Sequence, residues 1–149
     1  MAKISVNLNE KFIDRMDWAQ KEFFLQALVK MASIDGHFDE CEKMFILDMA
    51  DEMQVAPSVA QQIVENPTED AFIFEKASSL NNRVVALELI KEMCLLAHSD
   101  DDLSDKETIF IGKLGLAMGV ELEKIEQISN WVIDYLIWYG QGKIIFERV

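Results

Sequence analysis

An internal repeat with an offset of 65 residues constrains the fold of this chain more than any other feature of its sequence. Residues 32–55 align without a gap with residues 97–120, since 97 − 32 = 65. The aligned positions include apolar residues at helical spacing and acidic residues in a short loop. This pattern predicts a pseudo-symmetric helical domain whose two acidic loops share one role. The identical pairs are Ala32/Ala97, Asp35/Asp100, Glu42/Glu107, Phe45/Phe110, Ile46/Ile111, Met53/Met118 and Val55/Val120.

The spacing of apolar residues predicts an all-α fold. Phe24, Leu28 and Met31 recur at steps of four and three residues, which places them on one buried face of a helix. We expect a single-domain helical bundle of about seven helices over residues 1–149, with two pseudo-symmetric halves and internal repeats at about 22–55 and 87–120. Three of the expected helices end at about Ile34, Met53 and Met118. The other four cover about 58–65, 69–79, 83–98 and 121–139.

Short strands are predicted at the two ends of the chain. In residues 3–8, apolar and polar side chains alternate, which is the period of a strand. Residues 143–149 are rich in apolar side chains and follow Gly140 and Gly142. We expect these two segments to pair and so to cover an otherwise exposed edge.

Turn and cap residues place the acidic residues at the boundaries between helices. The Asp-Gly pair at position 35 ends one helix, because glycine readily adopts the left-handed conformation at a helix C-terminus. Asp39 and Glu42 have the spacing of a capping box, in which each side chain accepts a hydrogen bond from the backbone N–H of the other residue. Ser104 and Glu107 repeat this spacing in the second half.

The two acidic loops are candidate sites for a divalent cation. Several carboxylates within a few residues repel one another, and a hard cation such as Ca²⁺, which takes oxygen ligands, would relieve that repulsion. Neither loop is an EF-hand, because the twelfth loop position is Ile46 in one and Ile111 in the other rather than a bidentate glutamate. The first loop offers Asp35, His37, Asp39, Glu40 and Glu42, and the second Asp100, Asp101, Asp102, Ser104, Asp105 and Glu107.

Capping alone also accounts for most of these residue types, and this alternative stays open. Asp at an N-cap and Glu at N3 satisfy backbone amides, and acidic groups in a first turn suit the helix dipole. Capping does not explain the three consecutive aspartates 100–102, so the second loop is the better candidate for an ion. His37 and His98 occupy non-equivalent positions, and we do not expect zinc, because structural zinc sites usually need four N or S ligands.

The strongly acidic composition narrows the classes of partner. A net charge of −13 and a sequence pI near 4.4 argue against nucleic acid, since neutralising phosphates requires Lys and Arg. The same charge attracts cations and basic proteins.

Residues 1–11 lack the apolar run of a signal peptide, and no stretch reaches the roughly 20 apolar residues that cross a bilayer. Cys41 and Cys94 show no paired spacing, so we expect reduced thiols in a cytoplasmic protein without direct membrane insertion.

Aromatic residues form a stripe on the last predicted helix. Helical spacing of this kind indicates a buried face that packs in the core. It is also typical of a surface that binds a partner or a second copy of the chain, because Trp and Tyr are common anchors at interfaces. A homodimer is therefore one of the expected assemblies. The stripe contains Trp131, Tyr135, Trp138 and Tyr139.

The repeated loop motif resembles that of the TerB-like family, named for tellurite-resistance protein B. Residues 32–42, ASIDGHFDECE, and residues 97–107 carry the resemblance, which extends over about 22–135. It implies an all-α fold with two pseudo-symmetric halves and an acidic site for Ca²⁺ or another divalent cation. Asp101 replaces the motif's glycine and Ser104 its second aspartate, so Asp102 is added to the ligands that the motif implies. The resulting set is Asp35, Asp39, Glu42, Asp100, Asp102 and Glu107.

The function expected from these features is that of a non-enzymatic acidic module. As the family resemblance implies for stress-response proteins, it would bind a divalent cation and a protein partner, with peripheral membrane association only through partners. The alternative is a metal-free scaffold whose acidic surface binds a basic protein. Catalysis is not expected, because the sequence contains no phosphate loop, no nucleophile elbow and no Glu-x-x-His pair of a di-iron site.

Overall fold

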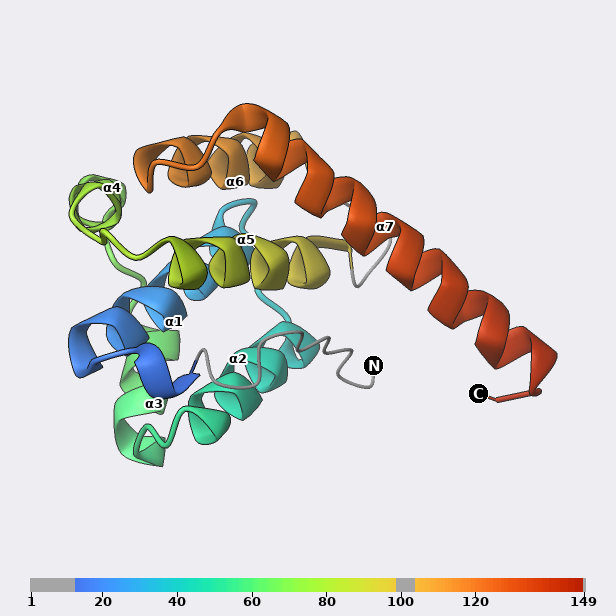
Figure 1. Ribbon diagram of the computed structural model, residues 1–149. Helices are drawn as coiled ribbons and strands as arrows, with labels where there is room; N and C mark the ends of the chain where they lie inside the picture. Colours follow the sequence, from blue (N-terminus) through green and yellow to red (C-terminus); the bar gives the residue numbers. More distant parts are fainter. Residues whose placement is uncertain (1–12, 99–103, 149) are drawn as a thin grey trace.

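The computed structural model describes residues 13–98 and 104–148, and over these residues the protein is a bundle of seven α-helices without strands (Figure 1). The all-α fold predicted from apolar spacing is therefore confirmed. A single 3₁₀ turn, Ile13–Arg15, precedes the first helix. The helices are α1 (Trp18–Ser33), α2 (Glu40–Glu52), α3 (Pro57–Glu65), α4 (Asp70–Ser78), α5 (Arg83–His98), α6 (Asp105–Ala117) and α7 (Leu122–Ile145).

The repeat in the sequence is also a repeat of helices. Helices α1 and α5 each have 16 residues, and α2 and α6 each have 13. The first residues of α1, α2 and α3 precede those of α5, α6 and α7 by the same offset, since 83 − 18 = 105 − 40 = 122 − 57 = 65. The two halves of the bundle are thus pseudo-symmetric at the level of their helix boundaries.

The ends of the second helix in each half are fixed by equivalent backbone hydrogen bonds. Val55 N–H donates to the Ala50 carbonyl at 2.9 Å, and Val120 N–H donates to the Gly115 carbonyl at 3.0 Å. This bond, from C″ back to C3, is the signature of a Schellman motif, in which the intervening residue is left-handed. That residue is Gln54 in one half, with φ of +62°, and Gly119 in the other, with φ of +85°.

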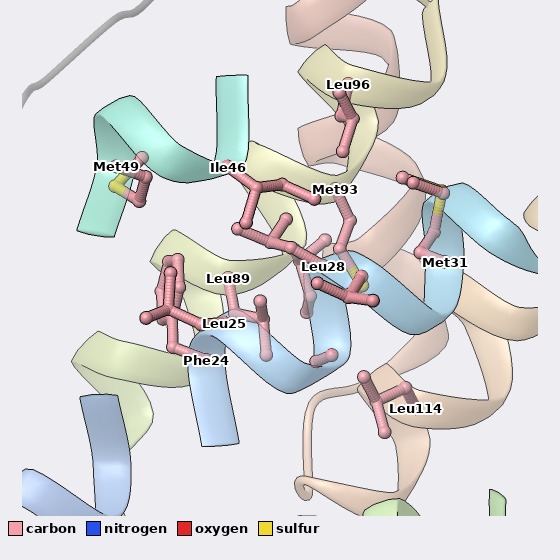
Figure 2. Packing of buried hydrophobic residues seen from close by; sticks show 14 of the residues in the cluster. Phe24, Leu25, Leu28, Met31, Ile46, Met49, Leu89, Met93, Leu96 and Leu114 are labelled. Atoms are coloured by element: carbon pink, nitrogen blue, oxygen red, sulfur yellow. The ribbon is translucent and has the colours of Figure 1, made fainter. Parts of the chain in front are cut away.

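The core lies around α1 and α5, the two longest helices of the bundle body. Helix α1 contacts α2, α3, α4, α5 and α6, and α5 contacts α1, α6 and α7. Figure 2 shows Leu28 of α1, Ile46 of α2 and Met93 of α5 gathered at the centre of the core, and all three are buried. The apolar stripe predicted for α1 is confirmed, because Phe24, Leu28 and Met31 are buried. The other buried apolar residues of this region include Leu25, Ala32, Phe45, Ile46, Met49, Ala50 and Met53.

The two halves differ after their third helix. In the first half, Pro67 follows α3, and the chain turns before α4, which packs against α1 and α6. Phe74 of α4 meets Phe110 of α6 edge-to-face, with ring centroids 5.8 Å apart. In the second half, Val132 stands at the position of Pro67, and α7 continues for 24 residues without a break. Helix α7 is therefore the uninterrupted counterpart of α3 and α4 together.

The strand predicted for residues 143–149 is wrong, because α7 is helical through Ile145, with Phe146 as its C-cap. The helix also continues beyond the end predicted at about residue 139. Gly140 and Gly142 do not end it, because each destabilises a helix interior by only about 1 kcal/mol relative to alanine. Extending a helix that is already packed needs no new nucleation. The Lys143 ammonium lies 5.2 Å from the Tyr139 ring, one turn back, which adds a cation–π contact. Residues 3–8, the predicted partner strand, lie outside the described residues.

Candidate functional site

The first acidic bend, between α1 and α2, is built from local hydrogen bonds. Gly36 has φ of +83°, and an Asp35 carboxylate oxygen accepts from the His37 backbone N–H at 2.9 Å. The Asp39 carboxylate accepts from Glu42 N–H at 2.8 Å, and the Glu42 carboxylate accepts from Asp39 N–H at 3.1 Å. The predicted capping box is confirmed, and it fixes the first turn of α2.

The second bend repeats this arrangement at the start of α6. The Ser104 hydroxyl accepts from Glu107 N–H at 3.1 Å, and the Glu107 carboxylate accepts from Ser104 N–H at 3.1 Å. Glu107 is buried, as is its counterpart Glu42. The predicted ligands Asp100 and Asp102 lie outside the described residues.

Each described candidate ligand therefore has a structural role of its own. Asp35, Asp39, Glu42 and Glu107 all accept backbone N–H donors within their own bends. Within residues 13–98 and 104–148, no group of three or more His, Cys, Asp or Glu side chains converges in a way that could hold a metal ion. Local hydrogen bonds thus account for the positions of these four carboxylates, whereas Asp100 and Asp102 belong to the segment 99–103, of which the structure describes nothing.

The two histidines differ in environment. His98, the last residue of α5, is partly buried, and burial lowers its pKa, so its imidazole is neutral at neutral pH. His37 is exposed in the first bend.

The two cysteines also differ, and neither is in a disulfide. Burial raises the pKa of the Cys94 thiol to about 12, although a hydrogen bond with the Ser129 side chain acts in the opposite direction. Cys94 is therefore a thiol rather than a thiolate at neutral pH and packs as a small apolar residue. Cys41 is exposed in the first turn of α2.

A buried ion-pair network lies on α5. The Lys91 ammonium is 2.7 Å from a Glu88 carboxylate oxygen and 3.6 Å from one of Glu92. All three side chains are largely shielded from solvent. Lys91 and Glu88 also line a hollow of about 320 Å³ between α5 and α7, which ends at Trp131.

The most exposed apolar surface of the described chain is on the C-terminal part of α7. We call residues 133–145 the distal segment, because Val132 is the last buried residue of the helix. Figure 1 shows this segment projecting away from the other helices. Trp138 is 69% exposed, whereas its counterpart in the repeat, Ile73 of α4, is 0% exposed (73 + 65 = 138). Other exposed apolar residues here are Ile137, Ile144, Ile145 and the C-cap Phe146.

Aromatic rings line one side of the distal segment. Tyr135 stacks on Trp131, with ring centroids 6.0 Å apart and planes inclined by 11°. Trp138 and Tyr139 lie 6.4 and 6.2 Å from the same Tyr135 ring. The prediction that this stripe packs in the core is wrong for Trp131 and Trp138, which are both exposed, while Tyr135 is partly buried against the core. Burial raises the pKa of Tyr135 further above its already high ordinary value, so the ring stays neutral.

A hollow of about 700 Å³ lies beside this stripe near the end of the helix. It forms because Gly142 presents no side chain between Trp138 and Phe146, and a Cβ added to Gly142 would meet nothing within 4 Å. The wall of the hollow is completed by Tyr139, Lys143 and Arg148.

The sequence predicted the aromatic stripe but assigned the apolar residues after Tyr139 to a strand, so their place on the same helix was missed. The signal was present in the repeat, where Pro67 of the first half aligns with Val132 of the second (67 + 65 = 132). Because proline disfavours the helical conformation in the residue before it, the first half must turn there, whereas the second half can continue.

Comparisons with known proteins add no relative. No family model, no curated protein and no solved structure matches this chain. In the part of the chain that the structure describes, no helix has the length and apolar character needed to cross a membrane.

Proposed function

We propose that this protein is a non-enzymatic interaction module that binds a protein partner through the distal segment of α7. The single observation that carries the proposal is the exposure of Trp138 and its apolar neighbours on a helix that projects from the bundle. Contiguous exposed apolar surface is characteristic of interaction sites in soluble proteins. Tryptophan and tyrosine are also the residue types that contribute most to binding at interfaces.

The contrast between the two halves supports this proposal. Helix α4 is tied to α1 by ion pairs, with Lys30 and Asp70 2.7 Å apart and Lys76 and Glu22 3.5 Å apart. At the equivalent place in α7, Trp138 is 69% exposed, whereas Ile73 of α4 is 0% exposed. The apolar face of α7 is left for another molecule to cover.

The test is site-specific photo-cross-linking in the source cells. A photoreactive residue replacing Trp138 should give protein adducts, because the side chain would lie within the interface. The same residue replacing Ile109 of α6, which is 54% exposed, is the matched control and should give none. Equal adduct yields at the two positions would remove the distal segment from the proposal.

Divalent-cation binding at the two acidic bends is a second candidate function. The observation that favours it is the matched pair of buried carboxylates, Glu42 and Glu107, at equivalent places in the two halves. We expect Ca²⁺ to raise the melting temperature, because a ligand that binds only the folded state stabilises it. The rise should be about 2–4 °C if binding adds about 1 kcal/mol, and it should be lost in Asp35→Asn combined with Asp100→Asn.

The control for this experiment is Asp51→Asn, which removes an exposed carboxylate of α2 outside the bends. It should keep the response to Ca²⁺. Identical melting curves with chelator and with millimolar Ca²⁺ would reject cation binding.

The resemblance to the TerB-like family adds an expected cellular location and process to the proposal. It is carried by residues 32–42 and 97–107. On this basis the module would act in the cytoplasm in a stress response and reach the inner face of the membrane only through its partners. An acidic scaffold that captures a basic protein is the alternative, supported by the net charge of −13.

A further inference from the structure

We propose that the partner of the distal segment is a second copy of the chain, and that two α7 helices pair side by side and antiparallel. This inference rests on the proposed function, because it names the occupant of the same surface. It is carried by the spacing, shape and charge of the residues along α7.

The spacing of side chains on α7 fits a paired helix. Trp131, Tyr135, Trp138, Gly142 and Ile145 follow one another at steps of four, three, four and three residues. We call these five residues the seam. Alternating steps of three and four residues keep side chains on the one stripe that faces a partner helix in a coiled coil.

The shape of the seam is self-complementary. It carries bulky rings, Trp131 and Trp138, and also the hollow over Gly142. In a two-fold interface each feature of one copy meets its complement on the other, so each ring that fills a hollow does so twice. In an antiparallel pair of helices, the numbers of any two opposing residues add up to the same sum. If Tyr135 lies opposite Trp138 of the second copy, this sum is 273, and Gly142 lies opposite Trp131 of that copy, since 142 + 131 = 273.

The hollow between α5 and α7 extends this stripe toward the bundle body. Its α7 wall is made by Lys124, Gln127, Ile128 and Trp131. In the same alignment Ile145 of the second copy lies opposite Ile128, since 145 + 128 = 273. The C-terminal end of the second α7 then lies about one helical turn from Lys124, whose charge suits the negative end of a helix dipole.

The charge distribution favours pairing at the distal segment over the rest of the surface. Each copy carries −13, but Asp134 and Lys143 are the only charged residues between 133 and 145, so this segment is neutral. An antiparallel arrangement also places the two acidic bodies at opposite ends of the helix pair. Repulsion between them is then smaller than in a parallel arrangement.

The experiment is sedimentation equilibrium of the purified full-length chain over a range of concentrations. The average mass should rise from 17.1 kDa toward twice that value. Gly142→Leu should weaken dimerisation by about 10-fold or more, because a side chain placed in the hollow collides with the opposing ring. Gly140→Leu is the matched control: it lies two residues away, outside the seam, also with nothing within 4 Å of an added Cβ, and should leave dimerisation unchanged.

The arrangement of the pair is tested with spin labels on Arg148→Cys in a Cys41→Ser background, since Cys94 is buried. Residue 148 of one copy lies opposite residue 125 of the other in this alignment, since 148 + 125 = 273. Antiparallel helices therefore keep the two labels roughly 35 Å apart, at about 1.5 Å per residue over the 23 residues between these positions. A label separation near 10 Å, the spacing of neighbouring helices, would overturn the antiparallel arrangement.

The outcomes separate this inference from the proposed function. A chain that stays monomeric at all concentrations overturns the inference, and if Trp138 still cross-links to a different protein, the proposed function stands. A dimer that Gly142→Leu and Gly140→Leu affect equally also overturns the inference. Cross-linked adducts of twice the chain mass from Trp138, together with the selective effect of Gly142→Leu, support both.

Discussion

At the residue scale, the repeat provides a comparison of two solutions to the same turn. Gln54 and Gly119 are equivalent residues after α2 and α6, and both have positive φ. The flanking hydrogen bonds to the Ala50 and Gly115 carbonyls are the same in the two halves. A non-glycine residue in the left-handed region costs roughly 1–2 kcal/mol, because Cβ approaches the following carbonyl oxygen. The first half bears a strain that the second half avoids.

We therefore expect Gln54→Gly to stabilise the protein. Part of the gain is lost, because glycine has more conformational freedom in the unfolded chain. The net increase in the free energy of unfolding should be about 0.5–1 kcal/mol. Gln54 is exposed, so no packing is lost. Urea denaturation of the two proteins measures the difference.

The reverse substitution in the other half is the control. Gly119→Gln should lower the free energy of unfolding by about 1 kcal/mol, because it places a side chain at φ of +85°. No gain from Gln54→Gly, or no loss from Gly119→Gln, would show that this strain is relieved elsewhere in the turn.

Two further pairs of equivalent residues show how a smaller side chain on one helix compensates for a larger one on its neighbour. Gly115 of α6 stands where Ala50 stands in α2, and Ile125 of α7 stands where Ala60 stands in α3 (50 + 65 = 115, 60 + 65 = 125). A Cβ on Gly115 would lie 2.5 Å from the Ile125 Cδ1 atom. The smaller residue in α6 therefore makes room for the larger one in α7, which allows α7 to pack closely before it leaves the body.

At the element scale, the sequence was sufficient to predict most helices and insufficient to predict α7. Helices α1, α2 and α6 begin at capping boxes, and those at Asp39 and Ser104 are visible in the sequence as spacing alone. Local hydrogen bonds of this kind depend only on residues three apart, so sequence predicts them well. The α5 bounds of 83–98 agree with the prediction, and at the start of this helix the Asn82 side-chain oxygen accepts from the Val85 N–H at 3.2 Å.

The extent and exposure of α7 depend on information that is not local. A short apolar run such as 144–146 is compatible with a helix or a strand, and only its connection to a packed helix decides between them. Helical spacing of the aromatic residues predicts that they share a face, but not what covers that face. In α4 the same face is covered by α1 and α6, whereas in α7 it projects from the bundle.

The acidic bends show the same limit at the level of a site. Sequence predicts that Glu42 and Glu107 complete capping boxes, and the structure confirms it. Whether these carboxylates also share an ion depends on the distance between bends that are 65 residues apart in sequence. No local pattern fixes such a distance.

At the scale of the whole molecule, two features act in opposite directions on self-association: the charge of the bundle and the apolar surface of its last helix. A chain of net charge −13 repels its own copies over most of its surface. The distal segment carries Asp134 and Lys143 and therefore no net charge. Association through this segment gains from burial of apolar rings and is opposed mainly by long-range repulsion between the two bodies.

The dependence of dimerisation on salt follows from this balance. Raising the ionic strength from about 0.05 M to about 0.5 M shortens the Debye length from about 14 Å to about 4 Å, which screens the repulsion between the bodies. We expect dimerisation to strengthen by roughly threefold or more over this range, because burial of the seam is not weakened by salt. Sedimentation equilibrium at the two salt concentrations measures the change. A surface that bound through its carboxylates would show the opposite sign, so dissociation of the dimer at high salt would mean that charge pairs, rather than the rings of α7, hold it together.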